Sequence, residues 1–337
     1  MAGFVVRCAV ALTVSTGAWL AQAATIAEMA ANAARNPTVT WYESSPAEQG
    51  DKVIAAFNAK YPQVKVKQIR LIGGNDVAVR VVQEMQARGY SADVVTSGAD
   101  HLWRLKERGY VVPVNGGAVT IAKAYLPDPT MMVTAASVYV LAWNTNKLKE
   151  SEVPTTWQQV LDPRWTNRIG SWVRAAAFAQ LAATQGVDTE RKELQRFVKL
   201  KPMLFKSTFP LAQAVGSGEI DLGIGFFHST LPPIAAGAPV KMHALDMVPM
   251  HTIYSGLTKG AKNPDGARLF LAWLASEDGA LAYEQATGRG NPMMPKTKTA
   301  QFIKGKKLSE WPPEKSGELG ALNDLFNEML ETVGAAR

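Results

Sequence analysis

Residues 38–70, TVTWYESSPAEQGDKVIAAFNAKYPQVKVKQIR, decide the fold class of this chain. They begin with the β-rich run TVTWY and end with VKVKQIR (64–70), which alternates apolar and polar residues like a second strand. Between the two runs, Val53 and Phe57 recur at helical spacing, and Pro62 stops that helix. The strand–helix–strand order predicts a βαβ unit with two parallel strands and a right-handed crossover.

The same alternation continues along the chain. ADVVT (92–96) predicts a third strand, and SVYVLAWN (137–144) has the profile of a fully buried strand. A second α/β region follows, with strands expected at IGSWV (169–173) and IDLGIGFF (220–227). Strands that alternate with helices predict mainly parallel sheets, and we find neither an internal repeat nor a long flexible linker. We therefore expect an α/β protein of two lobes that the chain crosses more than once.

The first 23 residues predict a secretory signal peptide that is cleaved after Ala23. Arg7 is their only charged residue, a short apolar run follows it, and Ala21-Gln22-Ala23 supplies an A-x-A cleavage site. The alternative is a membrane anchor, but the run is short for a bilayer and polar residues interrupt it. Cys8, the only cysteine, would leave with this segment. The mature chain would then have no disulfide and no thiolate metal site.

Composition argues for a large packed core, because 47% of the 337 residues are hydrophobic. The formal net charge of +7 weakly favours anionic ligands by long-range attraction. Much of the excess is local and is interpreted as a solvated basic face; its members are Lys296, Lys298, Lys304, Lys306 and Lys307. No aromatic residues are interleaved there in the manner of a nucleic-acid site, so no nucleic-acid partner is expected.

Six segments, in order, carry a resemblance to a known family. They are AAFNAKYPQVKV (55–66), SADVVTSGAD (91–100), VLAWNTNKL (140–148), VPTTWQQVLDPRWTNRIG (153–170), AVGSGEIDLGIGF (214–226) and NPDGARLFLAWLASEDGA (263–280). With them the chain resembles periplasmic solute-binding proteins of ABC transporters (extracellular solute-binding family 1), in the branch of ferric-iron, phosphonate and sugar-phosphate binders. The resemblance covers most of the mature chain and is mainly informative about the fold.

The resemblance implies an α/β periplasmic binding protein fold, with two lobes that are each a mainly parallel sheet flanked by helices. Loops at the carboxyl ends of the strands would face each other across a cleft, and a hinge of two crossing segments would close it. VYVLAWN and VPMHTIYSG are the predicted crossings. The predicted divisions are a signal peptide (1–23), one lobe (37–140 plus 252–286) and a second lobe (141–251 plus 287–337).

Iron is not the expected ligand, although iron binders belong to the same branch. Binders of ferric ion typically place adjacent tyrosines after the strand that here reads IDLGIG, because the hard ion prefers phenolate oxygen. This chain has FFHST (226–230) at that point, and the other usual ligands also appear replaced, near Pro46 and at Gly98. His228 alone is a weak metal ligand and is more typical of a hydrogen-bond donor or a structural residue. No metal and no cofactor are predicted.

An anion fits the sequence better than iron. Where iron binders hold a synergistic anion at a helix start, this chain reads Trp172-Val173-Arg174-Ala175. A helix N-terminus offers unpaired N–H groups, and the planar guanidinium of Arg174 suits a carboxylate or phosphate. The alternative is an exposed arginine at a loop end, but its place relative to the cleft favours Arg174 and Ala175 as ligand contacts.

Most of the other candidate ligand contacts lie at predicted strand ends, helix starts or crossings and have a structural alternative, while Arg289 and Asn291 lie in the loop TGRGNPMMP, which often borders the cleft in the family. Capping of a helix is the alternative for the residues that follow strands, core packing for Phe227, and hinge packing for Tyr254. Glu43 and Asp100 would also suit a ligand amine. The set is Glu43, Ser44, Ser45, Ser97, Asp100, Ser207, Thr208, Phe227, His228, Tyr254, Arg289 and Asn291.

The sequence therefore predicts the periplasmic substrate-binding component of an ABC importer. It would capture a small organic anion (phosphorylated, phosphonate or carboxylate) by hinge closure and deliver it to an inner-membrane ABC permease. The alternatives are a ferric-iron binder and a ligand-dependent periplasmic sensor. No enzyme is expected, because the chain has no nucleophile elbow, no phosphate-binding glycine loop and no paired histidine motif. We expect a monomer.

Overall fold

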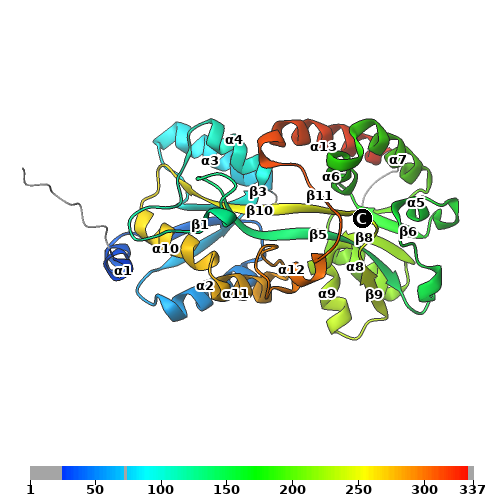
Figure 1. Cartoon of the computed structure of the whole chain (residues 1–337), viewed down its shortest axis with the longest axis horizontal. Coiled ribbons are helices and arrows are strands. Elements are labelled where there is room, and N and C mark those ends of the chain that lie inside the picture. The colour runs from blue at the N-terminus through cyan, green and yellow to red at the C-terminus, as the bar shows by residue number, and fades with distance from the viewer. Residues whose placement is uncertain (1–24, 72–73, 333–337) are drawn as a thin grey trace, which may run out of the picture.

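The computed structural model describes residues 25–71 and 74–332, so the predicted signal peptide lies outside the described residues. One sheet runs through the molecule in the order β2-β1-β3-β10-β5-β8-β6-β7, with β4 and β11 on β10 and β9 on β5 (Figure 1). The strands are β1 (Val39–Glu43), β2 (Val66–Arg70), β3 (Val94–Gly98), β4 (Val111–Val112), β5 (Met132–Asn144), β6 (Ile169–Trp172), β7 (Met203–Phe205), β8 (Leu222–Phe226), β9 (Val240–His243), β10 (Val248–Thr258) and β11 (Leu308–Ser309).

Helices cover both faces of this sheet (Figure 1). They are α1 (Ile26–Arg35), α2 (Ala47–Lys60), α3 (Gly74–Arg88), α4 (Ala99–Glu107), α5 (Trp157–Val160), α6 (Ala176–Gln185), α7 (Val187–Lys199), α8 (Thr208–Ser217), α9 (Phe227–Ala235), α10 (Pro264–Leu274), α11 (Glu277–Thr287), α12 (Lys298–Ile303) and α13 (Ser316–Glu331). Short 3-10 turns connect them at Lys123–Tyr125, Glu150–Glu152, Pro163–Trp165 and Pro313–Lys315. Among the described residues, no helix is long and apolar enough to span a membrane.

The two expected crossings are the longest strands and lie side by side. β5 and β10 pair antiparallel, from Met250 opposite Val138 to Ser255 opposite Met132, with a bulge at Ile253/Tyr254. All of β5 is buried, as predicted, but it begins at Met132, five residues before the predicted start. β3 likewise spans 94–98 rather than the predicted 92–96. These boundaries depend on neighbouring strands, which sequence periodicity does not show.

The first lobe packs around the βαβ unit that opened the sequence analysis. β1 pairs parallel with both β2 and β3, as predicted. Trp41 and Phe57 each meet the ring of Phe270 edge to face, at centroid distances of 5.2 and 5.1 Å. Such edge-to-face pairs are favourable beyond the apolar area that they bury. α10 and α2 are thereby fixed against the start of the sheet.

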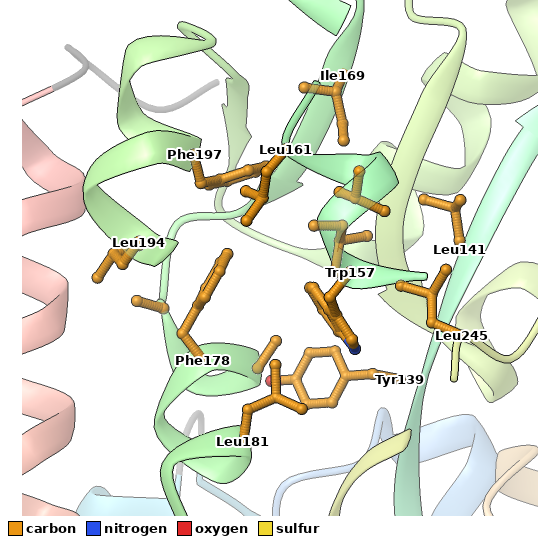
Figure 2. Close-up of a cluster of buried hydrophobic side chains, with 14 of the residues drawn as sticks. Tyr139, Leu141, Trp157, Leu161, Ile169, Phe178, Leu181, Leu194, Phe197 and Leu245 are labelled. Atoms are coloured by element: carbon orange, nitrogen blue, oxygen red, sulfur yellow. The ribbon is translucent and has the colours of Figure 1, made fainter. Parts of the chain in front are cut away.

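The second lobe has its own core between the sheet and helices α5, α6 and α7. Figure 2 shows Tyr139 of β5 beside Trp157, with Leu181 of α6 close by. The ring of Phe178 lies 5.6 Å from Trp157 and 5.3 Å from Phe197. β6 pairs parallel with β7 and β8, so this lobe also contains the expected parallel strands. The fold is the predicted two-lobed α/β arrangement.

The C-terminal part of the chain touches both lobes. α13 packs on α6 and α7 and also contacts α4 of the first lobe (Figure 1). Just before α13, the carboxylate of Glu310 accepts hydrogen bonds from the N–H and the hydroxyl of Thr252 in β10. α12 lies under the crossing strands, where Phe302 stacks near Phe227 at 4.6 Å. The predicted lobe boundaries stay a prediction, because these C-terminal elements contact more than one core.

Candidate functional site

The carboxyl ends of the parallel strands of both lobes converge beside the crossing strands. β1 and β3 end at Glu43 and Gly98, while β6 and β8 end at Trp172 and Phe226. The charge of Arg174, just after β6, acts on the imidazole of His101, just after β3. Side chains from the two lobes therefore face each other here, as expected for ligand sites in open α/β sheets.

Arg289 joins this group from the loop after α11. Its Nη1 donates a hydrogen bond to Ser45 Oγ at 3.1 Å. Its Nε is buried and has no hydrogen-bond partner within residues 25–71 and 74–332. The guanidinium also helps to lower the pKa of His228 and of His251, so it lies close to both imidazoles. Arg289 is thus a cation with hydrogen-bonding capacity that the folded chain leaves unused.

Two histidines, one buried and one half-buried, lie near Arg289. His228 is 4% exposed, and its ring stacks on Phe226 at 5.2 Å, while His251 meets the same ring edge to face at 5.5 Å. Burial, and then the charge of Arg289, holds the pKa of His228 well below its usual range and lowers that of His251 to about 4. Both rings are therefore neutral at neutral pH, and each has one N–H donor and one acceptor. Within the described part of the chain, His228 Nδ1 has no partner.

Arg174 and His101 are two further members of the group. Ser97 Oγ and Asp100 Oδ1 lie 3.0 and 3.2 Å from His101 Nδ1. Burial lowers the pKa of His101, the charge of Asp100 opposes that shift, and Arg174 adds to it. Arg174 itself is exposed, with its guanidinium 5.3 Å from the centre of the Trp172 ring. The structure thus places Arg174 near the strand ends, but it is more open to solvent than Arg289.

The start of α6 differs from the expected free helix N-terminus. The N–H of Ala175 donates to Asn327 Oδ1 of α13 at 2.9 Å. One of the orphan donors of this helix is therefore already satisfied by the protein. The sequence contains no sign of this contact, because the two residues are 152 positions apart.

Most of the polar candidate residues do not cap a helix, although helix capping was the alternative considered for them. Pro46 and Gly98 precede α2 and α4 without a side-chain cap, so neither Glu43 nor Asp100 caps a helix. At α8 the cap is Ser207, whose Oγ accepts from Phe209 N at 3.4 Å, and not the buried Thr208.

Glu43 is buried and fully engaged within the first lobe. Its carboxylate accepts hydrogen bonds from Ser45 Oγ at 2.9 Å, Gln68 Nε2 at 3.1 Å and Tyr283 OH at 3.2 Å. It also accepts from the backbone N–H of Ser45. These donors use the acceptor positions that a ligand amine would need. Glu43 therefore orients Ser45, which in turn holds Arg289, while Ser44 beside it is half-buried.

Three further candidates pack away from Arg289. Phe227 lies in the cluster below the crossing strands. Tyr254 pairs in register with Ser97 and packs in a core cluster of the first lobe. Asn291 is fully buried and donates from Nδ2 to the carbonyl of Val133 at 3.1 Å. Their side chains have structural contacts, so we leave them out of the candidate site.

Three residues near the strand ends were missed by sequence reasoning. They are His101, Trp172 and His251. Trp172 lies near the end of a predicted strand, His101 follows another, and His251 lies in a predicted crossing, so their positions in the sequence were an available signal. Among the described residues, no three His, Cys, Asp or Glu side chains gather in a metal-binding arrangement.

A cavity of about 580 Å³ opens beside this group, between α9 and α11. His228, Phe209 and Leu231 line it on the side of α8 and α9, and Gly288 and Leu281 line it on the side of α11. α9 and the end of α11 approach each other closely here, because a Cβ added to Gly288 would lie 3.1 Å from the Cβ of His228. The site therefore combines unpaired polar groups with space for a small organic molecule.

An α/β protein with polar groups and a cavity between two lobes is the architecture of a ligand-binding clamp. Residues 52–310 match the family model described as bacterial extracellular solute-binding protein. The chain belongs to that family. It is also 26% identical over 310 residues to an uncharacterized protein of Haemophilus influenzae, covering 84% of this chain and 86% of the relative.

Solved structures show the same fold. Iron-bound HitA from Pseudomonas aeruginosa is 21% identical with a TM-score of 0.71, over 88% of this chain and 99% of HitA. AfuA from Actinobacillus pleuropneumoniae, solved with exogenous fructose-6-phosphate bound, is 20% identical with a TM-score of 0.72, over 87% of this chain and 98% of AfuA. At these identities the likeness concerns the fold, and the ligand has to be argued from the site itself.

Proposed function

We propose that this chain is the periplasmic substrate-binding component of an ABC importer and that its ligand is a small organic anion. The observation that carries the proposal is the unpaired Nε of Arg289 beside the unpaired Nδ1 of His228. A guanidinium binds a carboxylate, phosphate or phosphonate through parallel N–H bonds, and a neutral imidazole can donate a further one. Binding would satisfy groups that are costly to leave buried and unpaired.

The arrangement of charges supports an anion over a cation. Arg289 and Arg174 contribute positive charge from two different loops, and Glu43 is fully hydrogen-bonded within its own lobe. Ferric ion is a poorer fit, because FFHST supplies no phenolate at the end of β8. The ligand would draw the lobes together about the β5–β10 pair and would then be delivered to the inner-membrane permease.

The direct test is a thermal-shift and calorimetric screen of the mature protein with inorganic phosphate, alkyl phosphonates, carboxylates and ferric citrate. We expect an anion to raise the melting temperature and Arg289→Gln to weaken its binding at least tenfold. Arg191→Gln, on the surface of α7, is the matched control and should leave affinity unchanged. Stabilisation by the ferric probe alone, unaffected by Arg289→Gln, would contradict the proposal.

Export and transport are tested separately from ligand binding. We propose that the signal peptide is removed after Ala23, so the first residue of the periplasmic protein should be Ala24 on N-terminal sequencing. Deletion of the gene should abolish uptake of the ligand. Loss of a signalling response with uptake intact would favour a sensor, and chemical conversion of the ligand by the purified protein would favour an enzyme.

A further inference from the structure

The cavity between α9 and α11 has two mainly apolar walls. Phe209, Leu231 and Pro232 lie on the wall of the second lobe, and Leu281 and Ala286 lie on the wall of the first. Its volume of about 580 Å³ falls in the range of pockets that bind small organic ligands. A bare ion would leave most of this apolar surface in water, whereas a hydrocarbon group would bury it.

Two of the polar side chains on the cavity wall are engaged with the protein. The carboxylate of Glu284 accepts from the backbone N–H of Lys298 at 2.7 Å and of Thr299 at 2.8 Å, and also from the Thr299 hydroxyl. Thr287 Oγ1 donates to the Tyr283 carbonyl at 2.8 Å. These groups have little capacity left for the hydroxyls of a polar ligand, and burying such hydroxyls unpaired is unfavourable.

One unpaired polar group lies on the cavity wall, and a second lies near it. His228 is one of the lining residues, and only 4% of its surface is exposed to solvent. Arg289 follows the lining residue Gly288 directly in the chain, and its Nε is unpaired among the described residues. The space thus has an apolar body and a hydrogen-bonding wall at His228, on which the charge of Arg289 acts.

We propose that the ligand is an amphipathic organic acid, whose acidic group binds Arg289 and His228 while its hydrocarbon part lies between α9 and α11. This inference rests on the proposed anion-binding function and narrows it to a class of ligand. The exposed Lys296 and Lys298 stand at the outer part of the same cavity. Lys296 is paired with Glu277 at 2.7 Å, so the inner Arg289 is the better partner for the acid.

The test is a homologous series of linear acids on the mature protein: methyl-, propyl- and hexylphosphonate, and in parallel acetate, butyrate and heptanoate. Affinity is measured by calorimetry and ranked by thermal shift. We expect affinity to rise about fourfold for each methylene that enters the cavity. Glycerol 3-phosphate serves as a polar comparator and should bind more weakly than the phosphonate of similar length.

Leu281→Gln places a polar group on the apolar wall from α11. It should reduce the affinity gain from methyl- to hexylphosphonate about tenfold, because the hydrocarbon then meets an unpaired amide. Leu325→Gln, at an exposed position of α13, is the matched control and should leave the gain unchanged. Arg289→Gln should weaken every acid of the series by a similar factor, whatever its chain length.

The two proposals fail in different ways. If no phosphonate or carboxylate stabilises the wild-type protein, the proposed anion-binding function fails. If the acids bind and depend on Arg289, but affinity does not rise with chain length or glycerol 3-phosphate binds best, only the amphipathic ligand is refuted. A chain-length effect that Leu281→Gln leaves untouched would refute the assignment of the hydrocarbon to this cavity.

Discussion

At the scale of single residues, the site depends on side chains whose partners come from distant parts of the chain. Ser45 accepts a hydrogen bond from Arg289, which is 244 positions away in the chain. Glu43 accepts one from Tyr283, which is 240 positions away. The sequence indicated Ser45 and Arg289 separately, since each lies in a loop beside a predicted helix. Their convergence was not predictable, because it requires α11 to pack on α2, and that packing is set by the whole first lobe.

Gly288 should be intolerant of a side chain for two reasons. Its φ of 74° lies in the left-handed region, and an added Cβ would lie 3.1 Å from the His228 Cβ. Gly288→Ala should therefore cost about 1 kcal/mol for the backbone conformation and a further ~1 kcal/mol or more for the contact. Gly109→Ala is the matched control, because its φ is 66° and nothing lies within 4 Å of its Cβ position. Equal losses in denaturant unfolding would contradict a role for the contact.

Glu190 should make stability depend on pH. It is 1% exposed in α7, and burial, followed by the nearby charge of Glu193, raises its pKa to about 8. The folded state therefore keeps a proton that the unfolded state loses above its ordinary pKa, so stability falls as pH rises from about 4.5 to about 8.

Glu190→Gln should flatten this profile. Relative to the wild type, the variant should gain on the order of 2 kcal/mol more unfolding free energy at pH 9 than at pH 4. The comparison is made by denaturant unfolding across that pH range. Asp188→Asn, with an 88% exposed side chain on the same helix, is the control and should leave the slope as in the wild type. A wild-type profile that Glu190→Gln does not change would show that this carboxyl is not protonated in the folded protein.

At the scale of elements, the local sequence pattern predicted the order of helices and strands well. It predicted the residues at which they begin and end poorly. The βαβ unit and the buried strand at 137–144 were predicted and are present. The first residues of β5, MVTAA (132–136), carry no strong strand signal of their own. They are extended because β10 pairs with them, and such tertiary pairing overrides local preference.

The capping contact between Asn327 of α13 and the start of α6 should contribute measurably to the free energy of unfolding. Asn327 accepts from Ala175 N at 2.9 Å, in the role of an N-cap side chain supplied from another helix. Asn327→Ala should cost about 1 kcal/mol of unfolding free energy. Asn327→Asp keeps an acceptor and adds a negative charge at the positive end of α6, so its stability should equal or exceed that of the wild type. Equal destabilisation by both substitutions would show that packing, not capping, is what Asn327 contributes.

At the scale of the whole molecule, two features join the lobes mechanically. β5 and β10 run as unbroken strands from one lobe into the other, and every described residue of β5 is buried. α13 adds a contact from the second lobe to α4 of the first. The resemblance predicted a hinge of two crossings, but the bridging role of α13 follows from its packing in three dimensions, which no pattern in residues 316–331 reveals.

These connections predict that the two lobes unfold together. The core around Trp41 and the core around Phe178 both include residues of β5, which pairs with β10, so unfolding either lobe would expose part of β5 in the other. Calorimetry of the ligand-free protein should give one transition, with calorimetric and van't Hoff enthalpies equal. Hydrogen exchange should then show amides of β1 and β6 protected by the same global free energy. Two resolved transitions would contradict cooperative unfolding, and so would amides of β6 that exchange well before those of β1. Either result would mean that β5 and β10 do not couple the unfolding of the two lobes, which would then fold independently.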